Sequence, residues 1–179
     1  MKKLHAAVLC VACAVLGALA QSGLAYAQRP TYSPDLVKGK DASAAATALL
    51  DGALQLAGSG SWERIAVGRA WYLGGDKARG QQIFDEVTGN RRVEGSDWFR
   101  IAQVYDEAGE WDKAQMAFDR ALSMDKDDDS GMVEYGARAN VNEDRAKAET
   151  LFDQAFKKNP REFWHWVGAG ASYLGVRPQ

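Results

Sequence analysis

The chain has 179 residues, with 22 Lys and Arg against 24 Asp and Glu and a formal net charge of −2. A chain of this length typically forms one domain. The slight acidity argues against a nucleic-acid-binding protein, which carries a basic surface, and against electrostatic docking on anionic lipid.

The first 27 residues have the pattern of a secretory signal peptide. A positive start at Lys2 and Lys3 precedes an apolar run over residues 6–20, and Ala-Tyr-Ala at 25–27 forms a small-x-small cleavage site. We expect cleavage after Ala27 and a periplasmic or secreted product. The alternative is an uncleaved N-terminal anchor, but the apolar run is shorter than the ~20 residues that a membrane span needs. Stable membrane insertion is therefore not expected.

Cleavage at this site changes the chemistry of the product. Both cysteines, Cys10 and Cys13, leave with the signal, so the exported chain has no disulfide, no thiolate nucleophile and no Cys metal ligand. Loss of Lys2 and Lys3 lowers the formal net charge from −2 to −4. Residues 28–40, with two prolines, are expected to form a flexible leader. Residues 41–58, rich in Ala and Leu, are expected to form an N-terminal capping helix.

A 34-residue period follows. Phenylalanine returns without a gap at Phe84, Phe118 and Phe152. Small residues return at two other positions of the period, which we call columns: Gly68, Ala102 and Gly136 in one, and Gly80, Ala114 and Ala148 in the other. The copies span residues 61–94, 95–128 and 129–160, and residues 161–176 form a half copy that is expected to be a C-terminal capping helix.

Each copy has the spacing of two amphipathic helices. In the second copy Trp98, Ile101 and Tyr105 lie on one helical face, and Phe118 lies on the face of a second helix. Gly109 separates the two, where a tight turn needs a permissive residue. In the third copy we expect Asn140-Val-Asn142 to serve, because Asn also tolerates the left-handed conformation.

This pattern resembles the tetratricopeptide repeat (TPR). The resemblance covers residues 61–176 and is carried by seven of the eight family columns, with the closing proline present only as Pro160: Trp98, Ile101, Ala102, Tyr105, Ala114, Phe118 and Ala121. It implies an all-α fold, an α-solenoid of about eight helices wound into a right-handed superhelix. It also implies a concave groove, lined by the first helix of each copy, that binds a peptide or protein segment. Matching this chain to the groove columns gives Trp62, Arg69, Tyr72, Phe99, Gln103, Asp106 and Asn140.

Other motifs are weaker. Asp125, Asp127 and Asp129 have the alternate spacing of an EF-hand loop, but the loop's Gly and bidentate Glu are missing. We therefore expect this segment to be an inter-repeat turn in which Asp129 or Ser130 caps the next helix. His165 lies between Trp164 and Trp166, and we expect it at the surface or at a helix cap. Recognisable catalytic and nucleotide-binding motifs are absent, so a non-enzymatic protein without cofactor or metal is expected.

Three functions remain open. The first is an exported adaptor or scaffold that binds a protein or peptide partner in its groove, with envelope assembly or secretion as the setting implied by the family. The second is a small-ligand or glycan-binding periplasmic protein that uses an aromatic surface of Trp62, Tyr72 and Phe99. The third is a self-associating protein in which the C-terminal helix stacks on a second copy.

Overall fold

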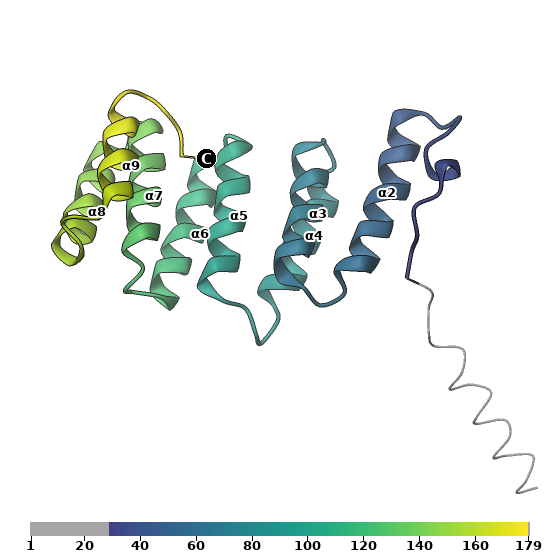
Figure 1. Cartoon of the computed structure of the whole chain (residues 1–179), viewed down its shortest axis with the longest axis horizontal. Helices are drawn as coiled ribbons and strands as arrows, with labels where there is room; N and C mark the ends of the chain where they lie inside the picture. The colour runs from purple at the N-terminus through teal and green to yellow at the C-terminus, as the bar shows by residue number, and fades with distance from the viewer. Residues whose placement is uncertain (1–28, 179) are drawn as a thin grey trace, which may run out of the picture. The chain divides into compact units, whose positions relative to one another are not determined.

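The computed structural model describes residues 29–178, and over this range the chain is all-α, as expected. The expected signal peptide lies outside the described residues. None of the described helices is both long enough and apolar enough to span a membrane. One short 3-10 helix, η1 (Pro34–Leu36), precedes the eight α-helices that the period predicts: α2 (Ala42–Ala57), α3 (Ser61–Leu73), α4 (Lys77–Thr88), α5 (Gly95–Glu107), α6 (Trp111–Met124), α7 (Asp129–Val141), α8 (Arg145–Lys158) and α9 (Phe163–Tyr173) (Figure 1).

The chain divides into two compact units, and the boundary in the sequence lies between Leu56 and Ala57. In the first unit, η1 forms one turn inside the expected flexible leader, and the Ser33 hydroxyl accepts a hydrogen bond from the Asp35 amide. Asp41 caps α2, since its Oδ1 accepts from the Ala44 amide at 2.8 Å. None of the residues of α2 is buried.

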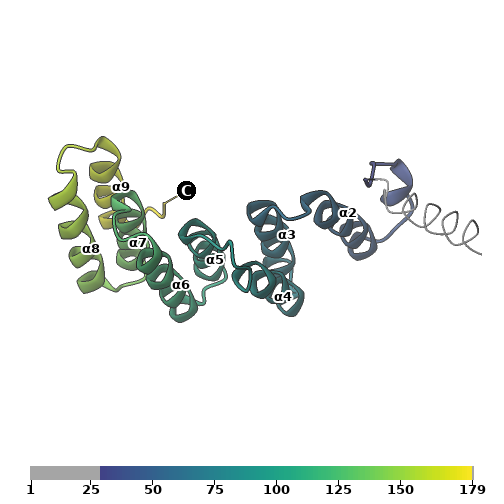
Figure 2. The same ribbon diagram turned by 90° about the horizontal axis from the view of Figure 1, so that it is seen from below.

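The second unit is built from helical hairpins. Helix α3 packs on α4, α5 on α6 and α7 on α8, while α9 packs on α7 without a second helix of its own. We call α3, α5, α7 and α9 the first helices and α4, α6 and α8 the second helices. The first helices form one layer of this unit and the second helices the other (Figure 2). All four first helices begin 34 residues apart, so the sequence period is also the structural period.

Each hairpin turns on a residue with positive φ. Gly75 (φ 105°) and Gly109 (φ 74°) fill this position in the first two copies, as expected for Gly109. In the third copy the residue is Glu143 (φ 68°), and Asn142 is the C-cap, so the expectation for Asn140–Asn142 was wrong by one position. The Asp144 amide donates to the Ala139 carbonyl at 2.9 Å, as Glu110 does to Tyr105, and this closure places the strain on residue 143.

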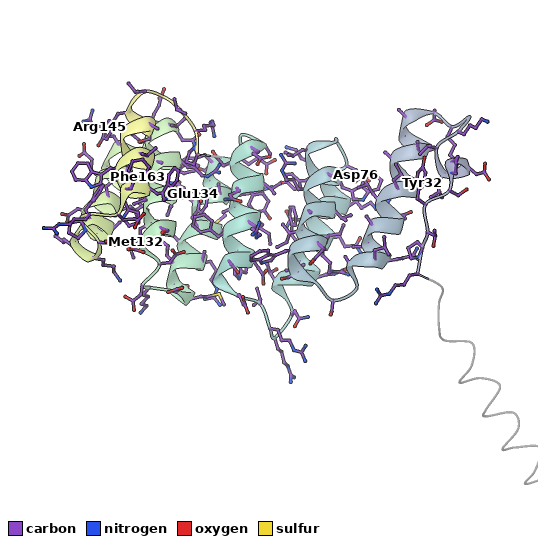
Figure 3. All side chains as sticks on the ribbon, in the orientation of Figure 1. Tyr32, Asp76, Met132, Glu134, Arg145 and Phe163 are labelled. Atoms are coloured by element: carbon purple, nitrogen blue, oxygen red, sulfur yellow. The ribbon has the colours of Figure 1, made fainter. Side chains whose placement is uncertain are left out.

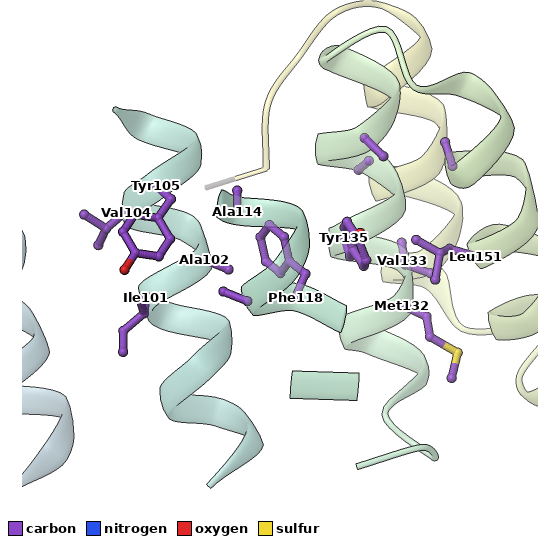
Figure 4. Packing of buried hydrophobic residues seen from close by; sticks show 14 of the residues in the cluster. Ile101, Ala102, Val104, Tyr105, Ala114, Phe118, Met132, Val133, Tyr135 and Leu151 are labelled. Atoms are coloured by element: carbon purple, nitrogen blue, oxygen red, sulfur yellow. The ribbon is translucent and has the colours of Figure 1, made fainter. Parts of the chain in front are cut away.

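The core lies between the two layers and is dominated by the Phe column. Phe118 is fully buried and stacks on Tyr135 of α7, with ring centroids 4.7 Å apart (Figure 4). Ala102 and Ala114 have no exposed surface, because α5 and α6 approach closely at these two small residues. Burial of one such aromatic side chain stabilises the fold by about 1.5–3 kcal/mol.

Two glycines at equivalent positions of the repeat, Gly136 and Gly170, have different surroundings in the structure. A Cβ at Gly136 would lie 2.7 Å from Cε1 of Phe152, whereas a Cβ at Gly170 would meet no described atom within 4 Å. We therefore predict that Gly136→Ala lowers the free energy of unfolding by about 1–3 kcal/mol, because the packed Phe ring must move. Gly170→Ala should raise it by about 0.5–1 kcal/mol, because alanine restricts the unfolded chain. Urea denaturation of both variants measures this, and equal effects would contradict the packing.

Candidate functional site: a groove on the first helices

Two hollows lie along α3, α5 and α7. One has a volume of about 570 Å³, and its walls include Trp62, Phe99 and Glu134. The other has a volume of about 970 Å³, and its walls include Asp106 and Arg138. Both hollows are also lined by Arg100 and Gln103, so together they form one continuous depression, which we call the first-helix groove.

Four of the predicted groove residues, Gln103 among them, lie on or beside this groove with side chains at least partly accessible. Trp62 is 52% exposed, and the Arg100 guanidinium lies 3.6 Å from the centre of its ring. Arg69 donates from Nε to Oε2 of Glu107 at 2.8 Å. Phe99 is half-buried, with its ring edge-on to Phe118 at 4.9 Å. An aromatic face with a stacked guanidinium is a surface chemistry that is common at binding hot spots.

Tyr72 departs from the expectation because it is buried in the core. Its ring packs against Phe84 and Tyr105, with centroids 5.6 Å away in each case. Its hydroxyl donates to Oε2 of Glu110 at 2.6 Å. Of the three aromatic side chains expected on this surface, only Trp62 and part of Phe99 are therefore accessible. The glycan-binding hypothesis loses one of its three aromatic contacts.

Glu110 is the residue that holds the Tyr72 hydroxyl. It stands 34 residues from Asp76 and Asp144, which cap α4 and α8 through their side chains. The longer Glu110 side chain instead reaches Tyr72, Lys77 and Lys113, and so ties the first two hairpins together. Hydrogen bonds from Lys113, Lys77 and Tyr72, in that order, lower the pKa of Glu110 to about 2.

Asp106 lies at the floor of the larger hollow and is also buried. Its Oδ2 accepts from Nη1 of Arg138 at 2.9 Å. Its Oδ1 accepts from Asn142 Nδ2 and from Nη1 of Arg177, both at 2.7 Å. Burial alone raises the pKa of Asp106, but the hydrogen bonds from Arg177, Asn142 and Arg138 outweigh it and hold the pKa below its ordinary value of 3.8.

Gln103 and Glu134 extend this polar cluster along the groove. Glu134 is labelled on α7 in Figure 3. Gln103 donates to its Oε1 at 2.6 Å, and Arg138 donates to the same oxygen at 3.1 Å. Asp106, Gln103, Glu134, Arg138 and Asn142 thus form one hydrogen-bonded set, which we call the Asp106 network. It joins α5 to α7 through charged and polar side chains, as Glu110 joins the first two hairpins.

Asn140 lies elsewhere. Its Nδ2 donates to the Ser172 hydroxyl at 3.0 Å, so it joins α7 to α9 and does not line either hollow of the groove. Asn142, two residues later, lines neither hollow either, but its Nδ2 donates to the groove residue Asp106.

The groove residues that sequence reasoning missed include Arg100, Glu134, Arg138 and Arg177. Arg138 left a signal, because its column otherwise holds Ala70, Val104 and Ser172. An arginine in a column of small and apolar residues indicates a buried cation, which must be paired because an isolated buried charge is costly. The acid that pairs with it is Asp106, which lies on the preceding copy.

The aspartate-rich turn before α7 is held by ordinary turn contacts. Asp128, rather than the expected Asp129 or Ser130, caps α7, since its Oδ1 accepts from the Gly131 amide at 2.7 Å. Asp127 pairs with Lys158 of α8. Among residues 29–178, no group of three or more His, Cys, Asp and Glu side chains has the arrangement to hold a metal ion.

The structure buries His165 of the C-terminal helix, which was expected at the surface or at a helix cap. His165 is 2% exposed and lies against Phe156, whereas Trp164 and Trp166 are 70% and 63% exposed. The reason is helical phase, because 165 falls in the inward-facing column of α9 and its two neighbours do not.

A further hollow of about 640 Å³ lies between the segments 58–64 and 86–97 and is lined by Arg64, Arg91 and Arg92 among others. It contains none of the predicted groove residues. Neither a protein-family model nor a curated protein matches the chain. The chemistry of the first-helix groove is therefore interpreted from its own residues.

Two of the groove's ion pairs, the buried Asp106–Arg138 and the exposed Arg69–Glu107, should differ in their effect on stability. Asp106→Asn is predicted to lower the free energy of unfolding at pH 7 by about 3 kcal/mol or more, because the cations of Arg138 and Arg177 are then left with the single carboxylate of Glu134. Arg69→Ala should cost under about 1 kcal/mol, because the Arg69–Glu107 pair is solvated.

The pH dependence gives a second readout. The pKa of Asp106 is lowered in the folded state, so its contribution is present above pH 3.8 and is lost as the pH falls through the lower folded value. Asp106→Asn should therefore flatten the loss of stability below about pH 4. Chemical denaturation of both variants at pH 7 and pH 3 measures both effects, and an unchanged acid slope in Asp106→Asn would contradict the assignment.

Proposed function

We propose that the protein is an exported, non-enzymatic interaction module of the TPR type, an α-solenoid that binds an extended segment of another protein in the first-helix groove. Its setting is the cell envelope or secretion, and cleavage after Ala27 releases the folded part. The observation that carries the proposal is the continuous groove along three successive first helices, with Trp62 exposed at one end and charged groups along its floor.

The charges of the groove support a polar partner over a purely apolar one. Guanidinium groups lie at several points on or beside it, with Arg100 on Trp62, Arg69 on Glu107 and Arg138 on Glu134. An extended peptide can meet such groups one after another, because its side chains and backbone polar groups recur along its length. A compact sugar or small ligand would need an enclosed site instead.

A capture experiment with matched variants tests this proposal. Trp62→Ala with Arg69→Ala removes one aromatic and one cationic side chain from the groove side. Met116→Ala with Arg120→Ala removes one apolar and one cationic side chain from α6, in the other layer. We expect a partner protein captured from the cell envelope to be lost by at least tenfold in the groove variant, which corresponds to about 1.4 kcal/mol.

The α6 variant is expected to retain the partner, and circular dichroism checks that both variants keep their helices. Equal capture by the wild type and the groove variant would contradict the assignment of the groove, and loss in the α6 variant alone would move the binding face to the second helices.

Self-association through the C-terminal helix is a second proposal, favoured by the exposed aromatic side chains of α9. Phe163, Trp164 and Trp166 are each more than 60% exposed, on a first helix that no second helix covers among the described residues. The repeat rule makes terminal helices that lack a partner the places where a stack continues or is capped.

Sedimentation velocity over a range of concentrations measures this second proposal. The wild type is predicted to grow in size with concentration, and Trp164→Ala to stay monomeric over the same range. Met116→Ala is the control, because Met116 is 67% exposed on α6. A wild type that remains monomeric at every concentration would rule the proposal out.

A further inference from the structure

The end of α9 differs in one respect from the ends of the other first helices. Helices α3, α5 and α7 each have 13 residues, and α9 has 11. It ends at Gly175 (φ 75°), where the Val176 amide donates to Ala171 and the Gly175 amide to Ser172. These two bonds form the same left-handed helix end that closes the other first helices, placed two residues early.

A helix that ends two residues early releases the chain on another side. Successive residues are rotated by 360°/3.6, so two residues correspond to about 200° around the helix axis. In the other copies the turn leads the chain into a second helix. After α9 the chain instead returns over the first helices, toward α7 and α5 (Figures 1 and 2).

The returning segment, residues 175–178, which we call the tail, reaches the floor of the groove. Arg177 Nη1 donates to Asp106 Oδ1 at 2.7 Å, across 71 residues of sequence. Arg138 Nη2 donates to the Pro178 carbonyl at 3.4 Å. Arg177 and Pro178 are lining residues of the larger hollow, so the tail occupies part of the groove in which a partner segment would lie.

The charges of the Asp106 network determine which kind of ligand group can take the place of Arg177. Within the Asp106 network, the carboxylates of Asp106 and Glu134 are paired with the single cation of Arg138, so loss of Arg177 leaves this network with one net negative charge, beside an Asp106 side chain that is 1% exposed. A cation brought by a ligand restores neutrality, and an anion or an apolar group does not. The site therefore selects a positively charged side chain.

The geometry selects arginine over lysine. Nη1 of Arg177 bonds to Asp106, and Nη2 lies 3.5 Å from Oδ1 of Asn142. A planar guanidinium can address both acceptors at once, whereas a lysine ammonium is a single point of charge. The tail is also easily released, because the Arg177 side chain is 47% exposed while that of Asp106 is 1% exposed.

We propose that the partner of the first-helix groove is an extended peptide that carries an arginine, and that the tail is a tethered competitor which holds the Asp106 network until that arginine displaces Arg177. The inference rests on the proposed function and specifies its ligand. A segment tied this closely to its site acts at a local concentration on the order of millimolar, so it lowers the apparent affinity of a free peptide without blocking it.

The test uses a peptide of known sequence. A fluorescein-labelled peptide Leu-Gly-Val-Arg-Pro-Gln, which copies residues 174–179, is titrated with the purified protein and followed by fluorescence anisotropy. We expect Arg177→Ala to bind this probe about tenfold more tightly than the wild type, because the competitor has lost its cation. Arg161→Ala, which removes an exposed arginine before α9, should bind the probe as the wild type does.

Two changes probe the mechanism without altering the groove. Replacement of the probe's arginine by alanine should abolish binding to Arg177→Ala, and replacement by lysine should weaken it at least tenfold. Insertion of Ala-Ala between Tyr173 and Leu174 keeps the tail sequence but turns its exit by about 200°. This insertion should bind the probe as tightly as Arg177→Ala does.

Equal binding of the probe to the wild type and Arg177→Ala would overturn the inference, as would equal binding of the arginine and alanine probes. The proposed function is tested separately by the capture experiment. If the groove variant loses its partner while the probe fails to bind Arg177→Ala, the groove stands as the binding site and only the arginine and the competing tail are wrong. If the probe binds Arg177→Ala but no captured partner depends on the groove residues, the arginine site and the competing tail stand and the proposed function is wrong.

Discussion

Contact between a phenylalanine of the second helix and a small residue of the first helix sets the geometry of the hairpins in residues 57–178. The ring of Phe84 faces Gly68 and the ring of Phe152 faces Gly136 at distances that leave no room for a Cβ in the observed packing. Each hairpin is thereby closed to the same spacing. Because the three hairpins have the same internal geometry, their first helices begin at equal intervals and present equivalent columns to one side of the unit.

The junction of α5 with α7 departs from this apolar plan. Where the sequence places Val104 in one copy, it places Arg138 in the next, and the buried guanidinium binds Asp106 and Glu134. A buried ion pair is weak support for stability, since desolvation offsets most of its attraction. Its contribution is to specificity, because charged hydrogen-bonding groups in a groove accept only a ligand whose polar groups complement them. The same junction holds Gln103 and Asn142, so each charge in it has a polar partner.

The ends of the chain are unlike its middle for a related reason. A repeat buries its faces against its neighbours, and the last first helix has a neighbour on one side only. In α9 this leaves Trp164 and Trp166 in solvent and draws His165 inward. The early end of the same helix turns the following residues back over the groove. One helix thus combines an uncovered aromatic surface with a tail that contacts the Asp106 network.

The sequence by itself determined the helical class, the 34-residue phase, the Phe columns and the glycine turns at Gly75 and Gly109, because each depends on a pattern that repeats along the chain. It also placed Trp62, Arg69, Phe99 and Gln103 on the side of the first helices that bears the groove. Only the tertiary structure decided that Tyr72 and Asp106 are buried, that Glu143 takes the third turn and that Asn140 faces α9. The outcomes for Tyr72, Asp106 and Asn140 depend on single contacts between residues more than 30 positions apart, such as Tyr72 with Glu110, Asp106 with Arg138 and Asp106 with Arg177. Periodicity reports which face of a helix a residue occupies, but the partner it meets there depends on how that helix packs against its neighbours, and a hydrogen bond is lost within an ångström of displacement.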